Sequence, residues 1–345
     1  MALTDCLGNA VTLQDSGSLA AVNDFAEGFI ACEARVLHVL PAATLDHSAI
    51  VQAYAAALQM FAETPGAPAN AQPFMQKALA AASSQATPRE ARFTAAVAAW
   101  VAGDIDRALV LHLEQATEFP RDLASVKLGQ YHAFNRGDMK TMLRLALLAS
   151  GSTGGAGDVP YLHGMLAFGW EQCQQLADAE REARLGMGLC RKEPWAHHAL
   201  AHVMLTQRRH REGQAFMQSV SDTWTGLNSF MLTHNWWHQA LFAIELGELD
   251  EALRLYDERV WGVAKDYSQD QANAVSLLSR LELQGLNVGD RWQDLAVHLV
   301  GRVNDQVSPF LDLHYLYGLA RAGRPEADAP LHHRAVRDGA GHRTD

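Results

Sequence analysis

The sequence predicts an all-α fold: a right-handed superhelical array of tetratricopeptide-like helix-turn-helix repeats. The first observation is a series of helix-ending positions with steps of 34, 37, 34, 39, 38 and 38 residues, at 103, 137, 174, 208, 247, 285 and 323. A period near 34 residues with two amphipathic helices per unit is typical of tetratricopeptide repeats. The second is composition, because 48% of the residues are hydrophobic and many are the helix formers Ala and Leu. Since repeats stack on their neighbours, 345 residues need only one continuous array.

The chain before this series predicts a different region at the N-terminus. Residues 1–17 show no helical pattern, and we expect them to be disordered. From residue 18 apolar side chains three and four apart predict a helix that ends at Pro41. Two more helices are expected, from the capping residue Asp46 to about residue 63 and over about 71–84. Residues 18–88 are therefore interpreted as a helical cap or as degenerate repeats.

The repeat array is expected over 89–336 and a disordered tail over 337–345. The glycine-rich stretch 151–158 predicts a flexible joint between two repeats. It has neither the lysine nor the preceding strand of a phosphate-binding loop, so the sequence carries no nucleotide-cofactor motif.

Charge and targeting features restrict the partners. The formal net charge is −11 and the basic residues are scattered, whereas nucleic acid and anionic membranes both require concentrated positive charge. No apolar stretch is long enough to span a bilayer, and the N-terminus does not resemble a signal peptide. The four cysteines form no Cys-x-x-Cys pair, as expected of thiols in a reducing cytoplasm. We therefore expect a cytoplasmic protein without nucleic-acid or membrane partners; the oligomeric state stays open.

The histidines gather in the first helices of successive repeats. Of sixteen histidines, His198 with His202 and His234 with His238 form pairs four residues apart, which places each pair on one helical face. First helices line the concave surface of such arrays, so the pairs are expected to meet in one polar pocket. The expected lining of this pocket also includes two tryptophans as apolar walls and further polar groups: His163, Trp195, Asn235, Trp237, Asp312 and His314.

Several functions fit such a pocket. Histidines at i and i+4 can bind zinc or iron, with His198, His202, His234, His238 and Asp312 as the candidate ligands. The same residues could instead act as acid–base catalysts, with Asp312 orienting a neutral imidazole. A third possibility is recognition of a small polar molecule, and a fourth is that the histidines are packing residues. The alternative at the level of the whole protein is a non-enzymatic scaffold whose groove binds a partner peptide.

Five segments resemble the tetratricopeptide repeat protein 38 family. They are His163-Gly-Met-Leu-Ala-Phe-Gly, Trp195-Ala-His-His-Ala-Leu-Ala-His-Val, His234-Asn-Trp-Trp-His-Gln-Ala-Leu, Leu255-Tyr-Asp-Glu-Arg and Ser279-Arg-Leu-Glu. The resemblance covers about residues 90–330 and is most specific at the segment from His234. It implies a soluble, intracellular superhelix of tetratricopeptide-like repeats. It does not imply a particular reaction.

Overall fold

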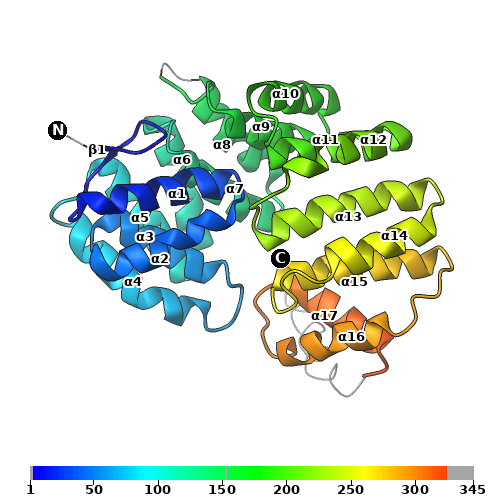
Figure 1. Ribbon diagram of the computed structural model, residues 1–345. Coiled ribbons are helices and arrows are strands. Elements are labelled where there is room, and N and C mark those ends of the chain that lie inside the picture. Colours follow the sequence, from blue (N-terminus) through cyan, green and yellow to red (C-terminus); the bar gives the residue numbers. More distant parts are fainter. Residues whose placement is uncertain (1–2, 152–153, 325–345) are drawn as a thin grey trace, which may run out of the picture. The chain divides into compact units, whose positions relative to one another are not determined.

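The computed structural model describes residues 3–151 and 154–324, and this part of the chain is almost entirely helical (Figure 1). The all-α prediction is confirmed. None of the described helices combines the length and the apolar character that crossing a membrane would require. The predicted end of the array at residue 336 and the predicted tail 337–345 lie outside the described residues.

The described chain divides into two compact units. Unit 1 consists of the chain up to Phe61 with Gly66–Arg209 and Ser219–Asn228, and unit 2 consists of Ala62–Pro65, His210–Gln218 and the chain from Ser229 onward. The sequence predicts one continuous array over 89–336, whereas the structure divides this range at α12 (His210–Val220). The loop after α12 returns to the N-terminal region of unit 1, where the backbone N–H of Asn228 donates to the carbonyl of Cys32 at 2.7 Å.

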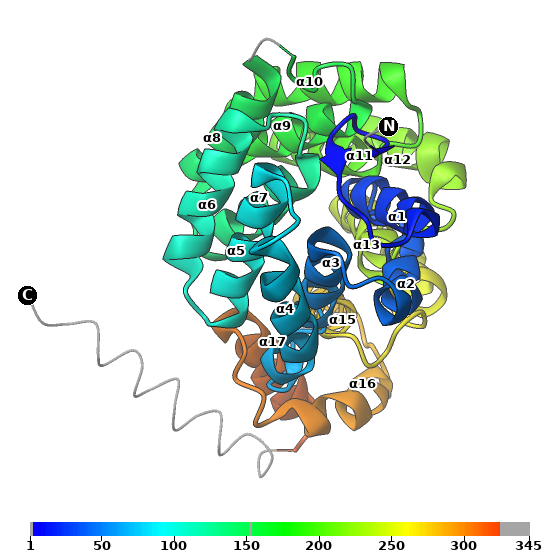
Figure 2. The ribbon, with the colours of Figure 1, turned by 90° about the vertical axis from the view of Figure 1, so that its left-hand side faces the viewer.

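The described part of unit 1 contains a short hairpin and the α-helices α1 to α11. Their bounds are β1 Leu3–Thr4, β2 Ala10–Val11, α1 Leu19–Ile30, α2 Val39–Leu45, α3 Ala49–Met60, α4 Ala67–Ala82, α5 Pro88–Val101, α6 Ile105–Glu118, α7 Leu123–Asn135, α8 Met139–Gly151, α9 Pro160–Gln172, α10 Leu176–Leu189 and α11 Pro194–Thr206. From α5 to α11 each helix packs against the next. In Figure 2, α6, α8 and α10 form one side of the unit, and α1 packs on α7 from the other side.

The core of unit 1 is built around stacked aromatic side chains. The ring of Tyr54 on α3 lies 3.9 Å from that of Phe25 on α1 and meets Phe93 on α5 edge-on at 5.2 Å. All three side chains are almost completely buried. Burying such rings is strongly favourable, so these three residues help to hold α1, α3 and α5 together.

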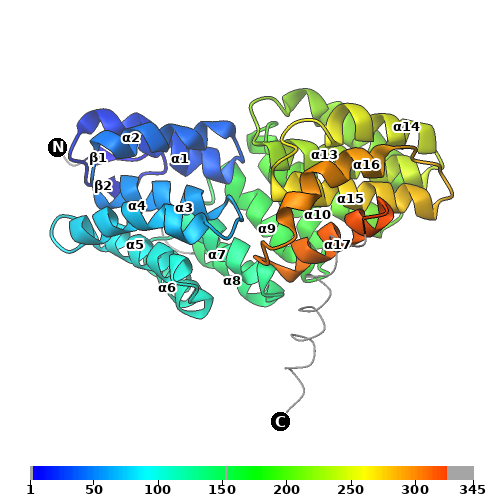
Figure 3. The ribbon, with the colours of Figure 1, turned by 90° about the horizontal axis from the view of Figure 1, so that it is seen from below.

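Unit 2 contains the remaining helices, which Figure 3 shows from below. Their bounds are α13 Ser229–Glu245, α14 Leu249–Leu255, α15 Ser268–Leu283, α16 Arg291–Leu299 and α17 Pro309–Arg321, and a π-helical turn Tyr256–Val260 follows α14. α13 packs on α14 and α15, and α15 packs on α16 and α17. Gly213 on α12 touches the ring of Phe242 on α13 so closely that a Cβ atom there would clash.

The seven predicted helix-ending positions share one backbone geometry. All have positive φ, between 59° and 85°, at 103, 137, 174, 208, 247, 285 and 323. At each of them the next residue's N–H donates to a carbonyl five residues back, as Arg209 does to Met204 at 2.8 Å. This is the Schellman arrangement, which ends a helix in the left-handed conformation. Glycine adopts that conformation without strain and occupies five of the seven positions, whereas Gln174 and Arg208 do not have this freedom.

Two N-terminal predictions differ from the structure. Residues 1–17 are predicted to be disordered, but from Leu3 the chain forms the β1–β2 hairpin. Arginines of the repeat region bind its backbone: Arg89 donates to the Ala10 carbonyl at 3.2 Å and Arg121 to the Leu7 carbonyl at 2.6 Å. Pro41 is predicted to end a helix but lies in the first turn of α2, where its missing N–H has no helical partner to lose.

Candidate histidine site

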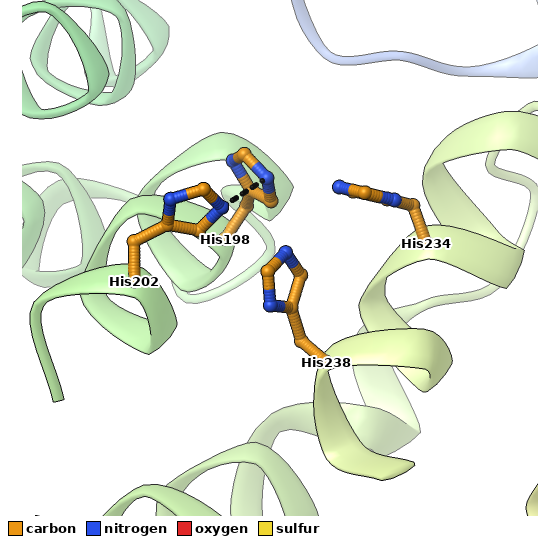
Figure 4. Close-up of side chains that lie close together, drawn as sticks. All are labelled: His198, His202, His234 and His238. Atoms are coloured by element: carbon orange, nitrogen blue, oxygen red, sulfur yellow. Dashed lines mark hydrogen bonds between the residues drawn. The ribbon is translucent and has the colours of Figure 1, made fainter. Parts of the chain in front are cut away.

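The first histidine pair lies on α11. Glu193 caps this helix, since a carboxyl oxygen of its side chain accepts a hydrogen bond from the Ala196 N–H. His198 and His202 follow one turn apart, and their Nε2 atoms lie 3.0 Å from each other (Figure 4). Two nitrogens bound to one tetrahedral zinc ion, each at about 2.0–2.1 Å from it, are about 3.3 Å apart. The observed separation therefore suits either a hydrogen bond between the two rings or chelation of one ion.

A buried carboxylate lies behind the second ring of this pair. Glu171 on α9 is only 5% exposed, and its Oε2 lies 3.3 Å from Nδ1 of His202. A carboxylate on the far nitrogen of an imidazole fixes the ring's orientation and makes the other nitrogen a better ligand. His202 thus has the carboxylate–histidine arrangement that accompanies many metal sites.

Aromatic side chains surround the α11 pair. The ring of Trp195 meets His198 edge-on at 5.0 Å, and the ring of Phe168 on α9 lies 5.2 Å from His198 and 6.0 Å from His202. Such apolar walls exclude water and strengthen electrostatic interactions with whatever the imidazoles bind.

The N-terminal region covers the beginning of α11. Trp195 Nε1 donates to Cys32 Sγ at 2.8 Å, and Glu33 forms an ion pair with Lys192. Glu33 also forms a single antiparallel bridge with Leu227. The segment after α1 is therefore fixed against the end of α11 that carries Trp195.

The second pair lies on α13 of unit 2. The rings of His234 and His238 are 4.8 Å apart, and Figure 4 shows them one turn from each other on this helix. Nδ1 of His234 lies 2.9 Å from Oδ1 of Asn273 on α15, whose Nδ2 in turn donates to Thr233 Oγ1 at 3.2 Å. Because the amide oxygen faces the ring, Nδ1 of His234 is the donor in this contact.

This network ends in a buried acid. The Thr233 hydroxyl donates to Oδ1 of Asp270 at 3.1 Å, and burial raises the pKa of Asp270 to about 6. A chain of hydrogen bonds thus runs from Asp270 through Thr233 and Asn273 to His234. Such outer partners hold a histidine in one tautomer and one orientation.

His163 and His314, two other predicted lining residues, have hydrogen-bond partners of their own. His163 uses both ring nitrogens, one on Glu182 at 2.9 Å and one on the Gly157 carbonyl at 3.2 Å. It precedes Glu171 by eight residues, about 12 Å along α9, so the structure does not bring it to the α11 pair. His314 on α17 is held by the Phe310 carbonyl at 2.7 Å.

Asp312 and Asn235 lie on different helices of unit 2, α17 and α13. α17, which carries Asp312, packs on α15 and α16, and the polar partner of His234 comes from α15. Asn235 is completely buried on α13, and the polar side chain that contacts His234 is that of Asn273. The ring of Trp237 stacks parallel to that of His234 at 5.3 Å.

Sequence reasoning missed Glu171 and Asn273. Asn273 follows His234 by 39 residues, close to the repeat period, and this spacing could have indicated it. Glu171 stands three residues before the turn at 174, and nothing in the pattern distinguishes it from a surface carboxylate.

No protein-family model matches this chain. Its chemistry must therefore be inferred from the side chains themselves. Within the described residues, His198, His202, His234 and His238 can each offer one ring nitrogen to a metal ion. Neutral imidazoles suit zinc, copper, nickel and iron, whereas magnesium and calcium prefer oxygen ligands.

Proposed function

We propose that this protein binds a small polar molecule through a divalent transition-metal ion held by His198, His202, His234 and His238. The observation that carries the proposal is the 3.0 Å separation of the His198 and His202 Nε2 atoms together with the Glu171 carboxylate behind His202. Two imidazoles at this separation are preorganised for one ion, so binding requires little rearrangement.

The two pairs act as one site in this proposal. His234 follows His198 by 36 residues, and His238 follows His202 by the same number. The turn that ends α13 follows the turn that ends α11 by 39 residues. Each histidine on α13 therefore lies three residues farther from the end of its helix than its counterpart on α11 does. Three residues are close to one helical turn, and both pairs therefore occupy the same face of their helices. In stacked repeats, corresponding faces of successive first helices are neighbours.

The fold in this proposal is a right-handed tetratricopeptide-like superhelix in the cytoplasm, as the resemblance to the tetratricopeptide repeat protein 38 family implies. The seven left-handed turns at steps of 34 to 39 residues support a repeating unit. The net charge of −11 supports the absence of nucleic-acid and anionic-membrane partners.

Coverage of α11 favours a small ligand over a partner peptide. A peptide-binding scaffold requires an open groove along its first helices. In unit 1, the segment at Cys32 and Glu33 is bonded to Trp195 and Lys192 at the start of α11. An extended peptide lying along this helix would have to displace these contacts, whereas an ion or a small molecule would not.

Metal content tests the proposal. Tag-free protein purified without chelators is analysed by plasma mass spectrometry, and zinc binding to chelator-treated protein is measured by calorimetry. We expect one equivalent of metal in the wild type and its loss in both His202→Ala and His238→Ala. The matched control is His298→Ala on α16, whose ring pairs with the exposed Asp266 and should not affect binding.

Two results would contradict the proposal. Protein that binds no zinc, copper, nickel or iron would exclude the metal-held site. If His238→Ala retained full binding while His202→Ala lost it, the pairs would not share an ion. Circular dichroism must show that both variants remain helical, since a change in folding would also remove the metal.

A further inference from the structure

Lys127 on α7 has an unusual environment for a lysine. Its ammonium nitrogen lies 3.4 Å from the centre of the Trp195 ring, directly over the indole face. Within the described residues, no carboxylate forms an ion pair with it. Lys192 and Lys265, in contrast, pair with Glu33 and Asp294. The chain has only five lysines, at 77, 127, 140, 192 and 265.

The groups around Lys127 supply little negative charge. Burial raises the pKa of the Cys32 thiol to about 11 and that of the Glu193 carboxyl to about 8, so both are largely neutral at pH 7. The indole face attracts a cation but only modestly, by about 0.5–2 kcal/mol. A lysine ammonium group in such surroundings loses hydration, and the interactions it gains do not fully replace that loss. Burial therefore lowers the pKa of Lys127 to about 8.

We propose that Lys127 is a reactive amine that forms an imine with small aldehydes or ketones. The geometry that supports this is an amine packed flat against Trp195, without a carboxylate partner, on a side chain that remains partly exposed to solvent. Desolvated lysines without a counter-ion are the ones that proteins use as nucleophiles toward carbonyl carbons. A structural lysine would form an ion pair, and an ordinary surface lysine would be fully exposed. The Lys127 side chain shows neither feature.

The reaction is balanced without an added oxidant or reductant. The lone pair of the neutral Lys127 Nζ attacks the carbonyl carbon, and the carbonyl π electrons move to oxygen to give a carbinolamine after proton transfer. Loss of the hydroxyl group as water, with the second amine proton, leaves a carbon–nitrogen double bond. One amine and one carbonyl compound thus give one imine and one water.

The reactive fraction is set by the amine's protonation. An amine of pKa about 8 is roughly 10% neutral at pH 7, whereas an exposed lysine of pKa about 10.4 is only roughly 0.04% neutral. This ratio of a few hundred is reduced because a less basic amine is also a weaker nucleophile. We therefore expect Lys127 to react at least about ten times faster than an exposed lysine near neutral pH.

This site is independent of the proposed metal. Trp195 contacts both Lys127 and His198, but imine formation requires no ion. Labelling is therefore carried out in the presence of a chelator, so that failure of the metal proposal and failure of this one give different results.

The test uses glyoxylate with cyanoborohydride, which reduces an imine to a stable carboxymethyl-lysine. The full-length protein is labelled at pH 7, digested, and quantified lysine by lysine by mass spectrometry, with the N-terminal amine followed separately. Lys140, which is solvent-exposed on α8, is the internal control. We expect labelling of Lys127 to be at least ten times faster than that of Lys140, and the difference to disappear as the pH approaches 10.

A variant gives the second measurement. Lys127→Arg retains a cation over Trp195 and should keep the helical circular dichroism of the wild type while losing the fast label. Equal or slower labelling of Lys127 relative to Lys140 in the wild type would overturn the proposal. So would a Lys127 rate that keeps rising up to pH 10 in parallel with that of Lys140.

Discussion

Nδ1 of His202 lies 3.3 Å from the Glu171 carboxylate, while Nε2 of the same ring lies 3.0 Å from His198. One imidazole thus connects a buried acid on α9 to a second imidazole on α11. The acid gives the ring a defined direction, and the ring presents its other nitrogen beside that of His198. The two helices are therefore coupled at the position where the proposed ion would bind.

Replacing the acid should weaken metal binding without removing a ligand. In Glu171→Gln the side chain keeps its shape but loses its charge, so it no longer increases the basicity of His202. We expect zinc affinity to fall by about 10- to 100-fold, as is usual when an outer-shell partner is lost, and titration calorimetry measures the change.

Glu182→Gln is the matched control for this experiment. Glu182 makes the same kind of contact, at 2.9 Å, to Nδ1 of His163, which is not part of the proposed site. Its replacement should leave zinc affinity unchanged. Equal losses in both variants would mean that the effect comes from general destabilisation and not from His202.

Two buried histidines predict a loss of stability in acid. His112 and His132 are 0% and 2% exposed, and burial lowers the pKa of each to about 3. Below about pH 6.5 the unfolded chain takes up protons at these rings while the folded chain does not. Their stabilising contribution is therefore complete above pH 6.5 and is lost as the pH falls toward 3, by about 1.4 kcal/mol per pH unit for each histidine.

The variant His132→Leu isolates one of these contributions. The free energy of unfolding is measured with urea at pH 7 and pH 5 for the wild type and the variant. The wild type should lose about 2 kcal/mol more than the variant between these two values. His38→Ala provides the comparison, because this exposed ring pairs with Asp24 at the surface and is not buried. Identical pH dependence in the wild type and His132→Leu would contradict the prediction.

The buried ion pair between Arg89 and Asp122 predicts a strong effect on stability. The two side chains are 4% and 1% exposed and lie 3.1 Å apart, and Gln115 also donates to Asp122 at 2.8 Å. Asp122→Ala leaves the Arg89 charge buried without compensation, which should reduce the free energy of unfolding by about 3–5 kcal/mol. Thermal unfolding followed by circular dichroism measures this loss.

An exposed pair in the same unit provides the comparison. Arg136 and Asp106 are also 3.1 Å apart, but their side chains are 47% and 77% exposed. Water screens such a pair, so Asp106→Ala should cost less than about 1 kcal/mol. If both variants lost the same stability, burial would not be the cause.

The repeat turns could be predicted from the sequence, and the reason is local. A left-handed turn requires a positive φ at one residue, which glycine adopts without strain. The turns are therefore marked in the sequence by glycines at 103, 137, 247, 285 and 323. Regular spacing then identified Gln174 and Arg208 at the same position although neither is glycine. The i, i+4 histidine pairs are also local features, since a helix alone places both rings on one face.

The partners of these histidines depend on tertiary structure. Glu171 and Asn273 reach His202 and His234 from other helices, and which side chain does so is decided by helix packing. The β1–β2 hairpin was missed for a related reason. Its order depends on arginines more than 75 residues away that bind its carbonyl groups, as Arg89 does at Ala10.

Non-glycine residues in the left-handed turns predict that glycine will stabilise the protein. Gln174 and Arg208 have φ of 62° and 59°, a conformation that costs an ordinary residue about 1–2 kcal/mol. Glycine avoids this strain but loses more backbone entropy on folding, which offsets about half of the gain. Arg208→Gly and Gln174→Gly should each raise the free energy of unfolding by about 0.5–1 kcal/mol in urea titrations. The neighbouring Gln207 has φ of −83°, so Gln207→Gly should lower stability instead. If Arg208→Gly and Gln207→Gly changed stability in the same direction, strain at the turn would not explain the effect.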